Sequence, residues 1–190
     1  MNGHEDTEAR RTARVSAEGD FAGVRDGFER LWTPHRMAYI KGERPSPDAG
    51  DGCPFCAAPG RSDEDGLIVH RGELCFVVLN LFPYNPGHLL VCPYRHVPLY
   101  VDLTDDETAE FTALTKRAIR ALEGASRPMG YNLGINQGAV AGAGVAAHLH
   151  QHIVPRWGGD MNFLPIVAQT KALPVLLEDT RRALVDAWSA

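Results

Sequence analysis

The feature that most constrains the fold is a row of three histidines at every second position, His148, His150 and His152. Side chains two residues apart share one face of a β-strand, so this spacing predicts a strand with three imidazoles on the same face. Leu149 and Ile153 would then point the other way, into a core. A solvent-facing polar row would more naturally use Thr, Lys or Glu, so the aligned imidazoles indicate a functional site.

The segment in front of these histidines is rich in small residues. Residues 136–145 include Gly138, Gly142 and Gly144, and glycines let backbone N–H groups come close to an oxyanion. Alone, such a stretch is compatible with a flexible connection, but next to the histidine row it predicts a phosphate cradle. A histidine on a rigid strand can be a nucleophile, an acid–base group or a metal ligand. Because an N-phosphoryl imidazolium is a good leaving group, a nucleophilic histidine here suits attack on phosphorus.

Length and charge limit the class of protein. The chain has 190 residues, a net charge of -5 and a pI of about 5.9, and no long basic face is visible. Nucleic acid is therefore not an expected partner, whereas a few local donors could still hold a small anion. No apolar run reaches the roughly 18 residues that a membrane helix needs. The polar, acid-containing segment 1–14 resembles neither a secretory nor a transit peptide, so a cytoplasmic protein is expected.

We expect a disordered arm over residues 1–18, which are polar and poor in bulky apolar residues, followed by one domain over residues 19–190. Apolar residues at helical spacing predict an amphipathic helix over 21–32. The Pro/Gly/Asp-rich stretch 41–65 is expected to be a loop unless something ties it down.

Strands and helices follow without regular alternation, which favours an α+β domain with a mostly antiparallel sheet over a Rossmann sheet. Thr104 and Glu107 form a capping-box pattern that begins a helix, which is expected to end before Gly124. Strands are expected over 66–70, 73–80, 88–93, 131–136 and 146–155, and a last helix over 174–188. The candidate core residues of the two helices are Phe111, Leu114, Ala118 and Leu122 in the first and Val175, Leu176, Leu184 and Trp188 in the second.

The four cysteines fall into two kinds. Cys75 and Cys92 lie in apolar runs and are expected to be small buried residues. Cys53 and Cys56 form a Cys-Pro-Phe-Cys pair, which on its own could be a redox dithiol, a metal knuckle or an accident of sequence.

The histidine row resembles the His-x-His-x-His-x-x signature of the histidine triad superfamily of nucleotide hydrolases and transferases, with Gln151 polar where the signature usually has an apolar residue. The run 80–93, with its Pro-Gly-His, and Asp102-Leu-Thr before a helix also match, so the resemblance covers about residues 66–156. The flanks resemble a longer actinobacterial branch that includes diadenosine tetraphosphate phosphorylases. The resemblance implies a histidine-triad-like fold with extra N-terminal and C-terminal helices, in a homodimer or homotetramer.

The resemblance also implies roles for single residues. His150, the middle histidine, would be the nucleophile that takes up the nucleotidyl group, and His152 would bind phosphate oxygens. His88 is similar to a fourth histidine behind the triad. Asn80 matches the position that hydrogen-bonds the ribose, and Asn136 the polar residue near the α-phosphate.

One departure concerns the leaving group. Family members usually carry Gln, Ser or Thr just before the triad, where this chain has Gly144 and Val145, so assistance would come from the backbone, from His152 or from elsewhere. A phosphorylase would also need to hold a second anion near the glycine cradle, with Arg156 or Trp157 as candidates.

The acceptor decides the reaction. Water would give a hydrolase, or a phosphoramidase where the leaving group is an amine, and orthophosphate as co-substrate would give a phosphorylase that releases ADP and ATP from diadenosine tetraphosphate. The complete triad favours water, whereas the flanks favour phosphate and span more residues, so phosphorolysis is the preferred prediction. A non-catalytic nucleotide-binding module is the alternative of another class, but it would have no need of three aligned histidines.

Two thiols and two imidazoles form a candidate metal site. Cys53, Cys56, His96 and His148 make up the ligand set that zinc prefers, and zinc-bearing relatives show similar spacing, with the first triad histidine as a ligand. With four protein ligands the site would be structural and would tie the 41–65 segment to the histidine strand.

Overall fold

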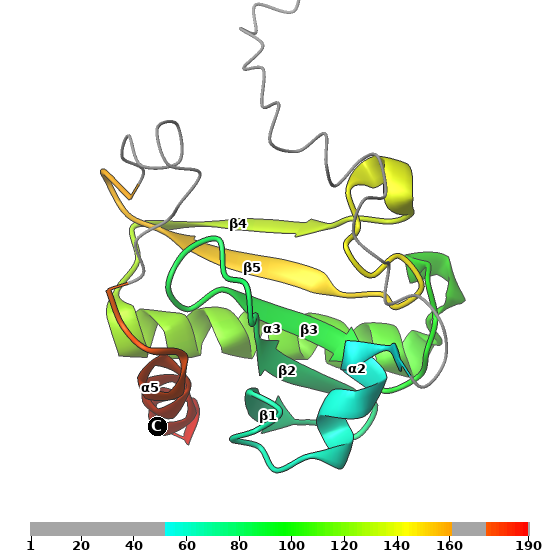
Figure 1. Ribbon diagram of the computed structural model, residues 1–190, viewed down its shortest axis with the longest axis horizontal. Helices are drawn as coiled ribbons and strands as arrows, with labels where there is room; N and C mark the ends of the chain where they lie inside the picture. Colours follow the sequence, from blue (N-terminus) through cyan, green and yellow to red (C-terminus); the bar gives the residue numbers. More distant parts are fainter. Residues whose placement is uncertain (1–51, 161–173, 190) are drawn as a thin grey trace, which may run out of the picture. The chain divides into compact units, whose positions relative to one another are not determined.

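The centre of the structure is a five-stranded sheet in the order β1-β2-β3-β5-β4, in which every neighbouring pair is antiparallel (Figure 1). The computed structural model describes residues 52–160 and 174–189. The strands are β1 (Ile68–Arg71), β2 (Cys75–Leu79), β3 (Leu89–Pro93), β4 (Gly130–Ile135) and β5 (Gln151–Arg156). The helices are α2 (Pro54–Ala57), α3 (Asp105–Ser126) and α5 (Leu177–Ser189), with short 3₁₀ turns η3 (Ala58–Gly60), η4 (Tyr100–Asp102) and η5 (Ala139–Ala141). The predicted α+β class with an antiparallel sheet is confirmed.

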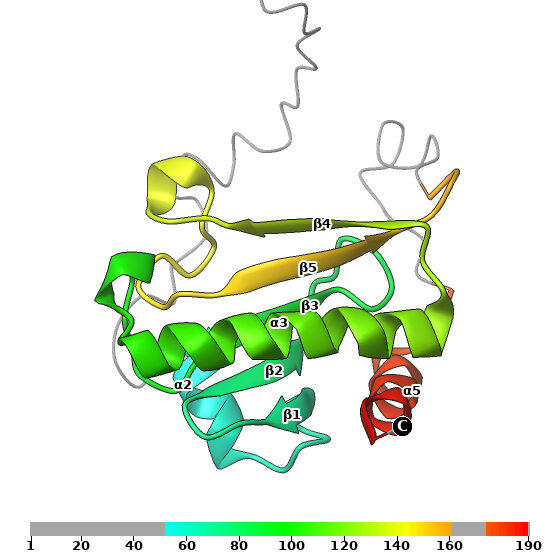
Figure 2. The same ribbon diagram turned by 180° about the vertical axis from the view of Figure 1, so that it is seen from behind.

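The two faces of the sheet are covered by different elements. The long helix α3 lies along one face and the short α2 lies on the other, as Figures 1 and 2 show from opposite sides. β2 and β3 are buried throughout, because alternate side chains of each strand enter two separate apolar clusters. On the α2 face the cluster contains Phe76, Val78, Leu90 and Cys92, with Phe55 packed against it.

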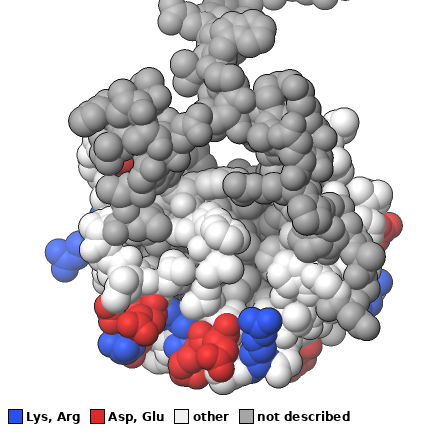
Figure 3. All heavy atoms as spheres, in the orientation of Figure 1, with Lys and Arg blue, Asp and Glu red and all other residues white. Residues whose placement is uncertain are grey.

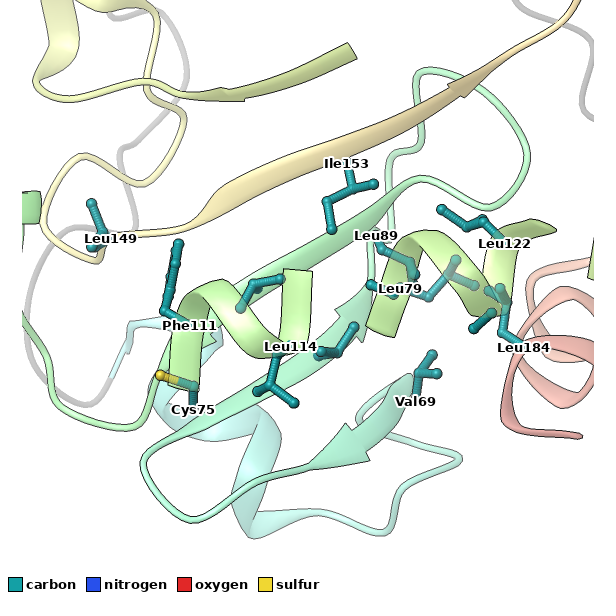
Figure 4. Close-up of a cluster of buried hydrophobic side chains, with 14 of the residues drawn as sticks. Val69, Cys75, Leu79, Leu89, Phe111, Leu114, Leu122, Leu149, Ile153 and Leu184 are labelled. Atoms are coloured by element: carbon teal, nitrogen blue, oxygen red, sulfur yellow. The ribbon is translucent and has the colours of Figure 1, made fainter. Parts of the chain in front are cut away.

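The larger cluster lies between the sheet and α3 (Figure 4). It includes the four predicted positions of α3, together with Leu149, Ile153 and Leu184. The prediction that Leu149 and Ile153 face a core is therefore confirmed, and so is the burial of Cys75 and Cys92.

The helix α3 begins as predicted but ends later than predicted. Thr104 and Glu107 form the full capping box, with both reciprocal hydrogen bonds present. The helix runs past Gly124 to Ser126, and Arg127 adopts the left-handed conformation that closes it. A Cβ at position 124 would lie 3.3 Å from the Cβ of Ala187, so this glycine serves the close approach of α3 and α5 and does not end the helix.

The strand that carries the histidines starts later than predicted. β5 begins at Gln151 and not at residue 146, and it pairs with β3 through His152 opposite Leu90 and Ile153 opposite Leu89. The chain before it bends away from the ladder, because the N–H of Leu149 donates to the carbonyl of Val97 at 2.7 Å. His148 and His150 therefore precede the strand.

The last helix is shorter than predicted. α5 begins at Leu177, and Val175 and Leu176 are 48% and 65% exposed, so their assignment to the core is wrong. Leu184 is buried and Trp188 packs against the larger cluster, as predicted. No described helix is long and apolar enough to cross a membrane.

Part of the segment expected to be a loop is helical. Residues 54–60 form α2 and η3, beginning with the N–H of Ala57 donating to the carbonyl of Cys53 at 3.1 Å. Ala58 and Phe55 pack these turns against the apolar cluster on the α2 face of the sheet, here called the α2-face cluster. This tertiary contact cannot be predicted from the local sequence. The predicted arm over 1–18 and helix over 21–32 lie outside the described residues.

Candidate active site

Four potential metal ligands meet beside the start of β5. Cys53 precedes α2, Cys56 lies in α2, His96 follows β3 and His148 precedes β5. Their ligand atoms all lie within 4.8 Å of one another. The Nδ1 of His148 is 3.4 Å from the Sγ of Cys53, 3.5 Å from that of Cys56 and 3.2 Å from the Nδ1 of His96. A tetrahedral zinc with ordinary Zn–S and Zn–N bonds places such atoms about 3.3–3.6 Å apart, so the donor set fits a closed four-ligand site.

The hydrogen bond of His148 leaves the lone pair of its Nδ1 available to a metal. Its Nε2 lies 2.9 Å from the carbonyl of Pro93, which can only accept, so Nε2 carries the proton and the Nδ1 lone pair faces the cysteines. Burial, with smaller contributions from His96 and His150, lowers the pKa of His148 to about 4, so the ring is neutral near pH 7. Burial and the neighbouring Cys53 raise the pKa of Cys56. A divalent cation would offset that cost of ionising the thiol.

His150 is held as a neutral imidazole with its Nε2 unprotonated. Its Nδ1 donates to the backbone carbonyl of His148 at 2.8 Å, which assigns the proton to Nδ1 and the lone pair to Nε2. The side chain is 5% exposed, and burial lowers its pKa. A neutral imidazole with a free ring nitrogen is the form in which histidine is a nucleophile.

His152 is held in the opposite tautomer by a chain of hydrogen bonds from the β2–β3 loop. The backbone N–H of Tyr84 donates to the Nδ1 of His88 at 3.1 Å, so the proton of that ring is on Nε2. His88 Nε2 then donates to the Nδ1 of His152 at 2.9 Å, which leaves His152 with its proton on Nε2. Burial, with a smaller electrostatic contribution from His150, lowers the pKa of His152 to about 4. His152 therefore offers a neutral N–H donor, and its ring centroid lies 5.0 Å from that of His150.

Asn80 supports this chain from the end of β2. Its Nδ2 lies 3.2 Å from the Nδ1 of His88, and its Oδ1 accepts from the N–H of Phe82 at 3.1 Å. The side chain thus shapes the loop that orients His88.

A pocket of about 340 Å³ adjoins His152. It is lined by Tyr84, Asn85, Asn132, Leu133, Gly134, Asn136, His152, Val154 and Arg156. Two of the predicted nucleotide-binding residues, His152 and Asn136, lie in this lining, whereas Asn80, Gly142 and Gly144 do not.

The basic group of this pocket is already paired. The guanidinium of Arg156 donates to both oxygens of Asp160, at 2.6 and 3.0 Å, and to the Oδ1 of Asn132 at 2.8 Å. The Nδ2 of Asn85 bonds the same carboxylate at 2.8 Å and the carbonyl of Pro155 at 2.9 Å. All three guanidinium nitrogens of Arg156 thus have partners, and the contacts with Asp160 hold the pKa of that carboxyl well below its usual range.

The glycine-rich segment forms a defined turn. η5 is flanked by Gly138 and Gly142, with φ angles of 80° and 85° that other residues rarely adopt. The Oε1 of Gln137 accepts from the N–H of Tyr100 at 2.7 Å and ties this turn to η4.

Three site residues were not found by the sequence reasoning. Asn85 and Asp160 are 75 residues apart, and nothing in the local sequence marks the amide as the partner of the carboxylate. Phe55 contacts His150 and His148, with ring centroids at 4.8 and 5.5 Å. Its place between two candidate ligand cysteines was a signal that could have identified it.

Known proteins share both sequence and fold with this chain. The family model described as HIT domain matches residues 61–159. AP-4-A phosphorylase of Mycobacterium tuberculosis is 52% identical over 171 residues, which cover 88% of each chain. A bifunctional bis(5'-adenosyl)-triphosphatase/adenylylsulfatase of Arabidopsis thaliana is 41% identical over 93 residues, covering 49% of this chain and 51% of that protein. The crystal structure of a zinc-bound histidine triad family protein from Mycobacterium smegmatis superposes with a TM-score of 0.58 at 27% identity, covering 72% of this chain and 93% of that one.

Proposed function

The chain belongs to the HIT domain family, and from this premise we propose that it is a nucleotidyl-transfer enzyme that phosphorolyses diadenosine tetraphosphate to ADP and ATP. The observation that supports this chemistry best is that the two histidines are held in opposite tautomers. Nε2 of His150 has a lone pair, whereas Nε2 of its neighbour His152 carries a proton. The choice of substrate and acceptor is supported by the similarity to AP-4-A phosphorylase, which extends over 88% of both chains.

In the first step the Nε2 of His150 attacks the α-phosphorus of one adenosine. A P–N bond forms, the bond between this phosphorus and the bridging oxygen breaks, and ATP leaves. The Nε2–H of His152 stabilises the negative charge on the phosphate oxygens, and Nδ1–H of His150 keeps its bond to the carbonyl of His148 while the ring becomes cationic. No proton needs to leave His150 before attack, because its Nε2 is already unprotonated.

In the second step an orthophosphate oxygen attacks the adenylyl-histidine. The P–N bond breaks, the lone pair returns to Nε2 and ADP is released, so one substrate and one phosphate give one ATP and one ADP. A positioned acceptor outcompetes bulk water because a bound group reacts at a high effective concentration. We propose that Asn136, the turn around Gly142 and Gly144, and the pocket next to His152 hold the phosphate groups, and that Asn80 serves the ribose side.

The alternative is a nucleotide hydrolase, including an adenosine phosphoramidase. The complete triad favours it, since the third histidine stands where transferases of the family carry glutamine. Incubation with diadenosine tetraphosphate, with and without phosphate, separates the two. Phosphorolysis gives equal ADP and ATP only when phosphate is present, whereas hydrolysis gives AMP with ATP, or two ADP, whether or not phosphate is added.

We further propose that Cys53, Cys56, His96 and His148 bind one zinc ion. The bound ion would hold α2 against the histidine segment and would have no open position for substrate. Elemental analysis of the purified protein should find about one zinc per chain. Full stability of a metal-free protein would exclude this role.

We also propose a homodimer or homotetramer that works in the cytoplasm on nucleotides and not on nucleic acid. Among the described residues, β4 is an edge strand of the sheet and its Leu133 is 50% exposed, so a second copy would cover an edge that these residues leave open. Where charged side chains of the described residues are visible in Figure 3, acidic and basic groups lie next to one another. Light scattering at micromolar concentration tests the assembly, and a monomeric mass would contradict it.

A further inference from the structure

Phe55 has a contact that the proposed mechanism does not use. It lies in α2 between the two cysteines of the metal cluster, and its ring centroid is 4.8 Å from that of His150, at an interplanar angle of 39°. The same ring meets His148 edge-on, with centroids 5.5 Å apart and an angle of 66°. A single aromatic side chain therefore touches both the proposed nucleophile and a candidate metal ligand.

The orientation of the His150 ring depends on a hydrogen bond and on two ring contacts. One hydrogen bond, from Nδ1 to the carbonyl of His148, holds one corner of the imidazole. Rotation of the ring about its Cβ–Cγ bond would lengthen this hydrogen bond and move Nε2, the atom that must meet phosphorus in line. The ring of His152 meets that of His150 edge-on, with centroids 5.0 Å apart and an angle of 69°. Phe55 packs against His150 through a second ring contact.

Phe55 is itself held from two directions. Its ring packs against the α2-face cluster, which includes Phe76, Val78 and Leu90. Its backbone belongs to a four-residue helix flanked by Cys53 and including Cys56, and a helix this short has little stability of its own. A metal bound to the two thiols would fix the helix, and with it the position of the ring.

We propose that Phe55 is a positioning residue for His150: the metal-binding turn holds the aromatic ring, and the ring holds the imidazole in the orientation for attack. The inference rests on the proposed function, in which His150 is the nucleophile. Misplacing a reacting group by about 1 Å can cost roughly 100-fold in rate, so loss of this contact should slow adenylyl transfer without weakening substrate binding.

The test compares Phe55→Ala with Tyr94→Ala in the metal-loaded protein. Tyr94 is a matched control because it is also a partly buried aromatic residue packed on the α2-face cluster, where its ring stacks on Phe76 with centroids 5.2 Å apart. Phe55→Ala should lower kcat, and the single-turnover rate of adenylyl-His150 formation, by roughly 10- to 100-fold, with KM and zinc content within about twofold of wild type. Phe55→Tyr, which keeps the ring, should restore most of the rate.

A readout independent of turnover is the ¹⁵N spectrum of the histidine rings, with His150 assigned by its absence in His150→Ala. The His150 resonances should be sharp in the wild type and in Tyr94→Ala, and broadened or averaged between tautomers in Phe55→Ala.

The results separate the inference from the function on which it rests. A wild-type rate in Phe55→Ala, or a loss no larger than that of Tyr94→Ala, would overturn the positioning role while His150 stays the nucleophile. Absence of any adduct on wild-type His150 would instead overturn the proposed function. If Phe55→Ala loses its metal, Phe55→Leu decides, since it keeps apolar volume without the flat ring: a rate lowered by about threefold or more supports the role, and an unchanged rate contradicts it.

Discussion

The two faces of the sheet are built on different principles. On the α3 face, aliphatic and aromatic side chains fill one continuous cluster, and each makes non-directional contacts that depend on volume. On the α2 face, beside a smaller cluster, the chain places imidazoles, thiols and backbone carbonyls whose value depends on which atom carries a proton. Changes on the first face should therefore act mainly on stability, and changes around the histidines mainly on chemistry.

His150→Ala is expected to separate the effect on turnover from the effect on stability most clearly. The side chain is the proposed covalent acceptor, so turnover of diadenosine tetraphosphate should fall by at least roughly 10⁴-fold. The melting temperature should stay close to that of the wild type, because the larger cluster does not include this ring. Coupled assay of ATP release and thermal unfolding measure the two quantities, and retained turnover would refute the role of His150.

The converse change is Phe111→Ala in α3. The side chain is 1% exposed, and its removal should lower the free energy of unfolding by about 3–5 kcal/mol. Activity per folded molecule, measured well below the melting temperature, should stay within a few-fold of wild type. A large loss of turnover in a fully folded variant would show that the two faces are not separable.

The metal cluster belongs to neither class. Its ligands are reactive thiols and imidazoles, but its loss is expected to lower the stability of the fold more than the rate of the reaction. Cys56→Ala should abolish stoichiometric zinc binding and lower the melting temperature by roughly 5–15 °C, the shift that loss of a bound ligand commonly produces in a domain of this size. Cys75→Ala is the control, because this buried cysteine packs in the larger cluster. It should keep its zinc, and metal loss in both variants would point to general unfolding.

The smallest effect is expected at the start of α3, where a charge contributes to stability. Arg95 lowers the pKa of Glu107 to about 2 through hydrogen bonds of 2.6 and 2.7 Å, and the capping contacts with Thr104 act in the same direction. A carboxyl whose pKa is lower in the folded than in the unfolded protein stabilises the fold above its unfolded pKa, and the contribution disappears as the pH falls from about 4.5 to about 2. Glu107→Gln should thus cost about 1–2 kcal/mol at pH 7 and nearly nothing at pH 2, as measured by denaturant unfolding. A difference that does not change with pH would contradict the charge-based explanation.

The sequence predicts those parts of the molecule that depend on neighbours along the chain. The capping box at Thr104 and Glu107, the buried stripe of α3 and the antiparallel hairpin of β1 and β2 are local patterns, and the structure contains all three. The four metal ligands, although distant in sequence, could also be predicted, because cysteine and histidine are the residue types that bind zinc. The structure brings its four members together.

The remaining features depend on contacts between distant segments. From its neighbours in sequence, Gly124 is predicted to end the helix. In the structure it lies within α3 and allows the close approach of Ala187. The bond from Leu149 to Val97 delays the start of β5, and the bonds of Asn80 to His88 and Phe82 become visible only when the loop is folded. The tautomers of His150 and His152, on which the chemistry depends, are likewise set by backbone groups whose positions no sequence pattern specifies.

The most direct test of the account is to trap the covalent intermediate and discharge it. Wild-type protein mixed with diadenosine tetraphosphate in the absence of phosphate, and quenched in base, should carry one AMP on the peptide that contains His150. Addition of ¹⁸O-labelled phosphate before the quench should remove the adduct and place the label in the β-phosphate of ADP. An adduct on another residue, no adduct at all, or ADP without label would contradict the account.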